Sequence, residues 1–257
     1  MDHKQTVPEL FLSNNFHECH KWSHYLAIYE KHLSRFSNKN PVLLEIGVRR
    51  GGSLELWKKY FGESSTVIGV DIDKSCSELQ DNGFDIYIGD QSDQGFLEEI
   101  LNNHPTLDIV IDDGSHVASD IIKSFEYLYK RMSPNGIYII EDVSSEILSN
   151  DHTISLSDYF QEIVSQINLG FVEQSFLNEA DEVAQKYPEV PEKIAHSGLA
   201  RMRPPTHITS TTSSICFYPN MIILEKAPQS IRTSIKTAGM NEGIIQGYRT
   251  FLVQKEY

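Results

Sequence analysis

The sequence predicts an α/β fold: a Rossmann-like, doubly wound sheet that is mostly parallel and ends in an antiparallel hairpin. Two patterns predict the parallel part. Apolar runs alternate with amphipathic stretches between residues 43 and 140, and most of these runs end in glycine or acidic residues. The third observation is a pair of apolar runs, 213–218 and 221–225, joined only by Pro219-Asn220. Because parallel strands need a long crossover, so short a link makes this pair antiparallel.

The first expected strand, 43–48, runs into a glycine-rich turn at 47–52 and then into a helix over 54–60 that Ser53 could cap. The spacing is not Gly-x-Gly-x-x-Gly, and no Gly-Lys-Ser/Thr follows, so the usual phosphate cradle is missing. Together with the acidic Glu45, this favours a cationic, phosphate-free cofactor such as S-adenosylmethionine. The residues expected to hold it here are Glu45, Gly47, Gly51 and Ser53.

The other elements follow from the same patterns. Further parallel strands are expected at 66–72, 84–88, 107–111 and 137–140, and helices at 16–36, 96–101, about 119–131 and 155–167. Five α/β units closed by an antiparallel hairpin are the ordering of a class I methyltransferase sheet. We divide the chain into an N-terminal helical segment (1–40, with a loose lead-in over 1–15), a cofactor-binding domain (41–226, with a lid or substrate insertion at 170–206) and a C-terminal extension (227–257, with a helix at 241–254).

Composition limits the classes of partner. The chain has 257 residues, of which 40% are hydrophobic and 23% charged, as in soluble globular proteins. Its net charge of −14, with no basic stripe, argues against nucleic acid and anionic membrane surfaces. No apolar run approaches the roughly 20 residues of a membrane span. Three scattered cysteines without a CxxC motif predict reduced thiols and a cytoplasmic protein. A small-molecule or glycan substrate is expected, and assembly into a homo-oligomer stays open.

Ligands of open α/β sheets bind at the carboxyl ends of the strands. Asp71 ends the second strand, where its carboxylate could accept hydrogen bonds from a ribose; a solvated loop or helix-cap residue is the alternative. Asp90 and Gln91 follow the third strand and could bind an adenine edge. For these two, helix capping near Ser92 and Asp93 is an equal alternative.

A second group of polar residues follows the fourth and fifth strands. Asp112-Asp113 and Glu141-Asp142 are expected to meet, and converging carboxylates repel unless a cation intervenes. A divalent ion such as Mg²⁺, which prefers oxygen ligands, resolves that repulsion, and His116 is a candidate general base. The alternative is that Asp112 caps a helix, Glu141 pairs with a lysine and His116 is a surface residue. The combined set favours a metal site.

Two other features carry less weight. His17, His20 and His24 have helical spacing, but no CxxC or HxxxH completes a zinc site, so surface or cleft-lining residues are favoured. Arg201 and Arg203 lie in the proline-containing insertion and could clamp a substrate, with solvated loop charges as an equal alternative.

Several motifs together carry a family resemblance. They are His20–Tyr25, Ile28–Glu30, Leu44–Val48, Gly51–Leu54, Gly89–Asp93, Ile111–His116, Ile140–Asp142 and Ser214–Tyr218. In this order they resemble the macrocin and mycinamicin sugar O-methyltransferases, a bacterial family related to rhamnosyl O-methyltransferases and to proteins labelled cephalosporin hydroxylase. The resemblance covers roughly residues 16–226. The family often has Thr-Asp-Lys where this chain has Cys19-His20-Lys21.

The resemblance implies a class I, S-adenosylmethionine-dependent O-methyltransferase that acts on a sugar hydroxyl of a glycosylated natural product or surface glycan. It implies Mg²⁺ on Asp113, Glu141 and Asp142, with His116 as base and Asp113 also in the catalytic group. It implies the cofactor against Glu45, Gly47, Ser53, Asp71, Asp90 and Gln91; we include Gly51 and Asp112 in this set. Two alternatives stay open: a non-heme iron oxygenase, and a cofactor-binding pathway protein without turnover.

Overall fold

A computed structural model describes residues 5–13, 17–144, 155–168 and 206–227. Within these ranges it contains one sheet of seven strands in the order β3-β2-β1-β4-β5-β7-β6. The strands are β1 (Val42–Ile46), β2 (Thr66–Asp71), β3 (Asp85–Ile88), β4 (Leu107–Asp112), β5 (Met132–Glu141), β6 (Thr212–Tyr218) and β7 (Met221–Lys226). β1 to β5 pair in parallel, whereas β7 runs antiparallel to both β5 and β6. The predicted parallel sheet and its terminal hairpin are therefore confirmed.

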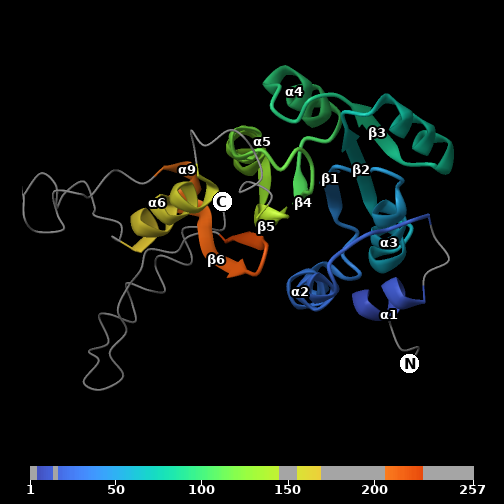
Figure 1. Ribbon diagram of the computed structural model, residues 1–257, viewed down its shortest axis with the longest axis horizontal. Coiled ribbons are helices and arrows are strands. Elements are labelled where there is room, and N and C mark those ends of the chain that lie inside the picture. Colours follow the sequence, from blue (N-terminus) through green and yellow to red (C-terminus); the bar gives the residue numbers. More distant parts are fainter. Residues whose placement is uncertain (1–4, 14–16, 145–154, 169–205, 228–257) are drawn as a thin grey trace, which may run out of the picture.

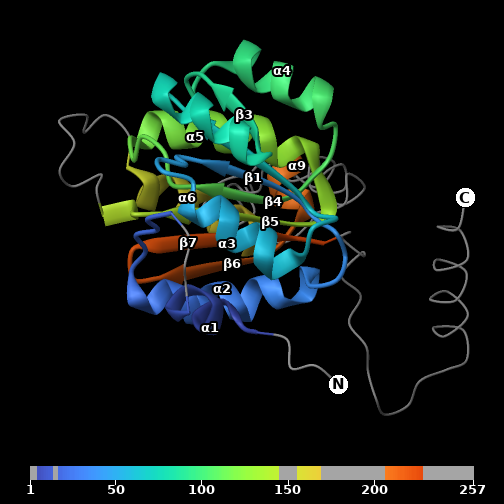
Figure 2. The ribbon, with the colours of Figure 1, turned by 90° about the vertical axis from the view of Figure 1, so that its right-hand side faces the viewer.

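Helices cover both faces of this sheet. They are α1 (Val7–Leu12), α2 (Ser23–Leu33), α3 (Gly52–Phe61), α4 (Gln94–Asn103), α5 (Ala118–Leu128), α6 (Leu156–Asn168) and α9 (His207–Thr211), with short 3-10 turns η1 (Ser34–Phe36), η2 (Lys74–Asn82) and η3 (Tyr129–Arg131). Figures 1 and 2 show α1 and α2 on one side of the molecule and α4 and α5 on the other.

Neighbouring residues of each strand serve two separate hydrophobic cores, because successive side chains point to opposite faces of a sheet. In β1, Leu43 packs with α1, α2 and α3, whereas Leu44 packs with α4, α5 and α6. In β5, Ile139 and Ile140 divide in the same way. All four are completely buried or nearly so. Continuous apolar runs, rather than alternating ones, are therefore what this doubly covered sheet requires.

Two expectations for the N-terminal region are wrong. The lead-in forms α1, which begins with a capping box in which the Thr6 hydroxyl accepts from the Glu9 backbone and the Glu9 carboxylate accepts from the Thr6 backbone. The helix expected from residue 16 begins only at Ser23, because residues 17–22 run along the strand ends instead. The Thr-Val-Pro-Glu spacing was the available signal for α1, since Pro8 is well tolerated in a first helical turn.

Of the remaining elements that the sequence predicts, some are confirmed and others fall on residues outside the described ranges. The helices expected after β1, β3 and β4 are present, as is the one at 155–167. The turn η2 was not expected; Asp73 caps it by accepting from the backbone of Ser75. Arg201 and Arg203, most of the 170–206 insertion and the tail helix at 241–254 lie outside the described residues. The division into segments stays a prediction.

Candidate active site

A cavity of about 400 Å³ opens at the carboxyl ends of β1 to β5, where the sheet topology places ligand sites. Its volume lies within the range of small-molecule sites. The walls come from the segments after these strands, from the first turn of α3 and from residues 18–21. The lining residues include Cys19, His20, Lys21, Gly47, Ser53, Asp71, Asp90, Gln91, Asp113 and Asp142.

The glycine turn after β1 gives the cavity its backbone wall. Gly47 has φ +86°, and a Cβ there would collide with the carbonyl oxygen of Asp113 at the end of β4. A Cβ at Gly52 would collide with the carbonyl oxygen of His17. Gly51, with φ +79°, is the N-cap of α3, so the predicted capping role of Ser53 is wrong: Ser53 lies inside the helix. The turn thus lets three backbone segments meet around one space.

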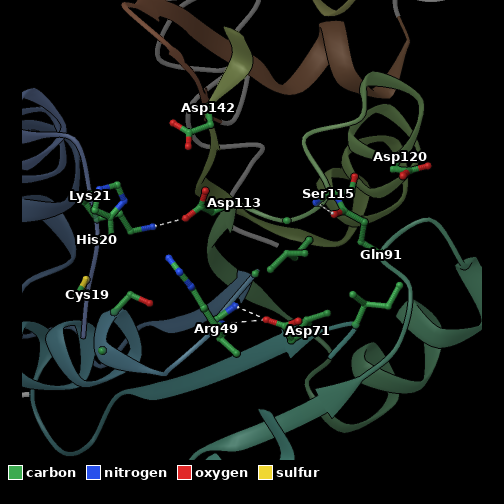
Figure 3. A pocket seen from close by; sticks show the side chains of 18 of the residues that line it. Cys19, His20, Lys21, Arg49, Asp71, Gln91, Asp113, Ser115, Asp120 and Asp142 are labelled. Atoms are coloured by element: carbon green, nitrogen blue, oxygen red, sulfur yellow. Dashed lines mark hydrogen bonds and ion pairs between the residues drawn. The ribbon is translucent and has the colours of Figure 1, made fainter. Parts of the chain in front are cut away.

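Asp71 fixes the end of β2 against this turn. Its Oδ2 accepts from the backbone N–H groups of Val48, at 3.1 Å, and Arg49, at 2.9 Å. Its Oδ1 accepts from the N–H of Asp73 at 2.9 Å. Figure 3 shows the Asp71 carboxylate on the wall of the cavity beside Arg49. Because a carboxylate offers about four acceptor sites, Asp71 can still accept a ligand hydroxyl.

Gln91 and Asp112 link the ends of β3, β4 and β5. The Gln91 amide donates to Asp112 at 3.0 and 3.2 Å and accepts from the Ser115 backbone at 2.7 Å. Asp112 is 1% exposed and also accepts from the hydroxyls of Ser124, at 2.9 Å, and Tyr138, at 3.0 Å. Burial raises the pKa of Asp112, and these hydrogen bonds oppose the rise. Both side chains are therefore engaged inside the protein.

Lys21 joins the carboxylates at the ends of β1, β4 and β5. Its Nζ lies 2.7 Å from Asp113 Oδ2, 2.9 Å from Glu141 Oε2 and 3.4 Å from Glu45 Oε1. The Lys21 side chain is only 3% exposed. Burial works against its charge, yet the surrounding acidic groups, Glu141 foremost, hold the pKa of Lys21 well above its usual value. Figure 3 shows Lys21 reaching from one wall to Asp113.

The two buried glutamates have further partners. The Tyr29 hydroxyl donates to Glu141 Oε1, and the Trp57 indole N–H donates to Glu45 Oε2 at 3.1 Å. Burial raises the pKa of both glutamates, and the charge of Lys21 opposes that rise. Each oxygen of Glu45 and Glu141 therefore has a partner from the protein.

Asp113, His116 and Asp142 form a separate group, with one ligand atom from each within 4.8 Å of the others. Asp142 Oδ1 accepts from the Trp22 indole and the Tyr25 hydroxyl, each at 2.9 Å. His116 Nε2 lies 3.8 Å from Asp113 Oδ1, and its buried Nδ1 has no hydrogen-bond partner within the described ranges. His116 and Asp142 both have positive φ, at 56° and 51°. We call Asp113, His116 and Asp142 the metal group.

The metal group fits a hard divalent cation, because two carboxylates converge beside an imidazole nitrogen. The cavity fits a cationic cofactor for a related reason. Glu45, Asp113 and Glu141 surround one lysine, and Asp142 lies near Asp113, so an excess of negative charge lies at this end of the cavity. A divalent ion and a sulfonium together carry three positive charges, which balance the excess when all four carboxylates are ionised.

The predicted site residues divide into two sets. Those that line the cavity are Gly47, Ser53, Asp71, Asp90, Gln91, Asp113 and Asp142. Those that are not among its lining residues in the described chain are Glu45, Gly51, Asp112, His116 and Glu141. For Glu141 the structure shows the alternative, a lysine partner. Direct contacts between the predicted residues and a cofactor or metal stay predictions.

The capping alternatives are also resolved. Asp93 caps α4 by accepting from the backbone of Gly95 and Phe96, whereas Asp90 accepts from Ser92 and stays on the cavity wall. The N-cap of α5 has no side-chain hydrogen bond, so Asp112 does not cap that helix.

Sequence reasoning missed the residues that hold the acidic side chains. Lys21, Trp22, Tyr25, Tyr29 and Trp57 all donate to carboxylates at the strand ends. The available signal was charge: so acidic a sheet edge requires positive charge or donors from elsewhere, and Lys21 lies in a segment that carries the resemblance. Helical periodicity conceals Lys21, because the apolar spacing of residues 20–25 predicts a single helix.

The histidine row is not a zinc site in the described structure. His17 pairs with Glu55 at 2.8 Å and His24 Nε2 lies 2.9 Å from the carbonyl oxygen of Pro219, so the two point to different partners. The three cysteines are free. Within the described residues, no helix has both the length and the apolar character that crossing a membrane requires.

Comparison with solved structures identifies the fold class. The fold is similar to that of a solved structure, the MycE methyltransferase of the mycinamycin biosynthetic pathway in complex with Mg and SAH. That similarity covers 96% of this chain and 61% of that one, with a TM-score of 0.67 and 23% identity. The chain has the class I methyltransferase fold. No protein-family model matches it.

The resemblance to sugar O-methyltransferases is confirmed at the level of sequence. The chain is 29% identical over 230 residues to the 8-demethyl-8-α-L-rhamnosyl tetracenomycin-C 2'-O-methyltransferase of Streptomyces olivaceus, a match that covers 83% of this chain and 53% of that relative. It is 38% identical over 123 residues to the demethylmacrocin O-methyltransferase of Streptomyces fradiae, covering 45% and 30% of the two chains. The chain thus spans about half the length, or less, of the curated relatives that it matches.

Proposed function

We propose that this class I methyltransferase transfers the methyl group of S-adenosylmethionine to a sugar hydroxyl of a glycosylated natural product or surface glycan, with a divalent cation such as Mg²⁺. One observation carries the proposal. The metal group lies at one end of a cavity whose other end is lined by Asp71 and the glycine turn. A methyl donor held at one end and an acceptor hydroxyl held at the other could therefore meet in one space.

The carboxylates of this site have distinct roles in the proposal. Asp71, held by the backbone of Val48 and Arg49, would accept hydrogen bonds from the ribose of the cofactor. Asp113 and Asp142 would hold the cation, with Glu141 behind them. When bound, the cation would lower the pKa of the acceptor hydroxyl and the cofactor would supply the methyl group.

His116 would take the proton of the acceptor. Its Nε2 faces Asp113, and an imidazole is a suitable proton acceptor at neutral pH. His116 lies in the turn after β4 with a positive φ, and its ring belongs to the metal group. The walls of the cavity would orient donor and acceptor and restrict water, which accounts for much of the acceleration of such transfers.

Support for the acceptor class comes from the relatives, whose names specify rhamnosyl, macrocin and mycinamicin substrates. The test is transfer of labelled methyl from S-adenosylmethionine to a panel of 6-deoxyhexosides and glycosylated macrolides, with Mg²⁺ or with EDTA. We expect product with Mg²⁺ and its loss in EDTA. Full activity in EDTA would contradict the cation role.

The same panel separates this proposal from its alternatives. Binding of S-adenosylhomocysteine without transfer to any acceptor would favour a cofactor-binding protein without turnover. An iron oxygenase usually uses two histidines and one carboxylate, whereas the metal group holds one histidine and two carboxylates. Calorimetry with Fe²⁺ and 2-oxoglutarate is therefore expected to show no binding of 2-oxoglutarate.

A further inference from the structure

Lys21 lies deeper in the acidic cluster than its place before α2 suggests. Its ammonium contacts Asp113 Oδ2 and Glu141 Oε2, at 2.7 and 2.9 Å, and so bridges the ends of β4 and β5. Glu45 at 3.4 Å closes the third side. Only 3% of the Lys21 side chain is exposed. A buried ammonium among three carboxylates is a substantial electrostatic feature, and the proposed reaction assigns it no step.

The two oxygens of Asp113 face different neighbours. Oδ2 contacts Lys21, whereas Oδ1 is the oxygen 3.8 Å from His116 Nε2, on the side of the metal group. Glu141 divides its oxygens between Lys21 and Tyr29. Lys21 therefore holds one oxygen of Asp113 and one of Glu141, while Asp113 Oδ1 is left on the side of His116.

We propose that Lys21 is a positioning residue: an internal counter-cation that holds Asp113 and Glu141 together and weakens, by its own charge, the affinity of the metal group for a divalent cation. The proposal rests on the cation part of the proposed function. Without Lys21 the three carboxylates repel one another, and a bound divalent ion becomes their main source of positive charge. A positive charge so near also repels an incoming cation, so its removal strengthens cation binding.

The test compares two buried lysines. Lys226 is also 3% exposed, but its ammonium donates to the carbonyl oxygens of Tyr129 and Met132, at 2.9 and 3.1 Å. Lys21→Met and Lys226→Met each remove one buried charge from the full chain. Thermal unfolding in EDTA and over a Mg²⁺ titration, with Mn²⁺ calorimetry, reports cation binding without requiring turnover.

We expect both variants to unfold at a lower temperature than the wild type in EDTA. Mg²⁺ should raise the unfolding temperature of Lys21→Met more than that of the wild type, with half-saturation at a concentration lower by about tenfold. Lys226→Met should keep the wild-type increment and the wild-type half-saturation. Lys21→Arg, which keeps the charge, should also respond as the wild type does.

Three results would overturn the proposal. Equal Mg²⁺ responses in the wild type, Lys21→Met and Lys226→Met would show that Lys21 has only a structural role, with the proposed function untouched. A Lys21→Arg response equal to that of Lys21→Met would show that charge is not the cause. No Mg²⁺ response in any protein would remove both this proposal and the cation part of the proposed function.

If Lys21→Met does not fold, the double variant Lys21→Met with Glu141→Gln replaces it, because it removes a buried ion pair rather than one of its partners. With one positive and one negative charge removed together, its Mg²⁺ half-saturation is expected within about threefold of the wild type. A shift beyond tenfold would overturn the counter-cation role.

Discussion

The two ends of the cavity satisfy their carboxylates in opposite ways. At the end of β2, Asp71 accepts three backbone N–H groups, from Val48, Arg49 and Asp73. At the ends of β4 and β5, Asp113 and Glu141 depend on side chains, chiefly the ammonium of Lys21. At the first end the carboxylate is stabilised by backbone hydrogen bonds, and at the other end the carboxylates are stabilised by the charge of a lysine side chain.

Because of this difference, the Asp71 end of the cavity has its geometry before a ligand binds, whereas the acidic end is stabilised further when a cation binds. Backbone donors are fixed once the glycine turn has folded, so Asp71 has its orientation before any cofactor binds. The acidic end retains more negative charge than Lys21 can balance, so it gains most from a cation. We therefore expect substitutions at the Asp71 end to weaken cofactor binding, and substitutions at the acidic end to lower the rate of methyl transfer.

The largest effect is expected at Asp113. Asp113→Asn keeps the size of the side chain but removes a charge from the metal group, so the rate of methyl transfer should fall by at least about a hundredfold, or roughly 2.7 kcal/mol. Calorimetry should find S-adenosylhomocysteine affinity within about threefold of the wild type. Asp158→Asn, an exposed site on α6, is the charge-matched control. Equal losses of binding and rate would contradict the division of the cavity.

A smaller effect, on cofactor binding rather than on the rate of transfer, is expected at Asp71. Asp71→Asn should weaken S-adenosylhomocysteine binding by about tenfold, or roughly 1.4 kcal/mol, because an amide accepts fewer hydrogen bonds than a carboxylate. The turnover number at saturating cofactor should change less than the Michaelis constant for S-adenosylmethionine. A turnover number that falls tenfold with unchanged affinity would place Asp71 on the chemical side of the comparison.

The support behind Asp112 should affect folding rather than ligands. Tyr138→Phe removes one donor from the buried Asp112 and should cost about 1 kcal/mol of unfolding free energy, which lowers the unfolding temperature by roughly 2–4 °C. The Mg²⁺ response should be unchanged, because Asp112 belongs to the link with Gln91 and not to the metal group. An altered Mg²⁺ response would show that the hydrogen bonds of Asp112 and the metal group are energetically coupled.

Asp112 also predicts a pH effect. Its folded pKa lies above the unfolded value, so the folded state binds the proton more tightly. Its stabilising contribution is therefore complete below pH 4 and is lost as pH rises through the folded pKa. Relative to Asp112→Asn, which cannot titrate, the wild type should lose unfolding free energy as pH rises from about 4, the unfolded pKa, to the folded pKa. A constant difference in denaturant unfolding across this window would contradict the shift.

The comparison also shows what could be predicted from sequence. Strand ends such as Asp71 and Asp113 follow from local patterns, because an apolar run and the acid after it are adjacent in the chain. Lys21 contacts residues 92 and 120 positions away, and no local period encodes such contacts. The pattern predicts a helix for its segment because Trp22 and Tyr25 fit an apolar face, although both donate to Asp142 in the structure.

Burial distinguishes neighbouring acidic residues that look alike in the sequence. Asp112 and Asp113 are identical side chains in adjacent positions, the last of β4 and the first after it, yet one joins Gln91 and the other joins Lys21. The sequence pattern identifies the pair but not which member faces the cavity. Glu141 and Asp142 repeat this division, with Glu141 buried and Asp142 on the cavity wall.

The smallest predicted effect is optical and tests the acidic end directly. The chain has two tryptophans, of which Trp57 is fully buried and Trp22 is 51% exposed. Trp22 donates its indole N–H to Asp142, so a cation that takes an oxygen of Asp142 should alter Trp22 emission. We expect a modest change on Mg²⁺ addition to the wild type and its absence in Trp22→Phe. An emission change that persists in Trp22→Phe would come from Trp57, whose indole donates to Glu45. It would show that the response to the cation reaches Glu45 and is not confined to Asp142.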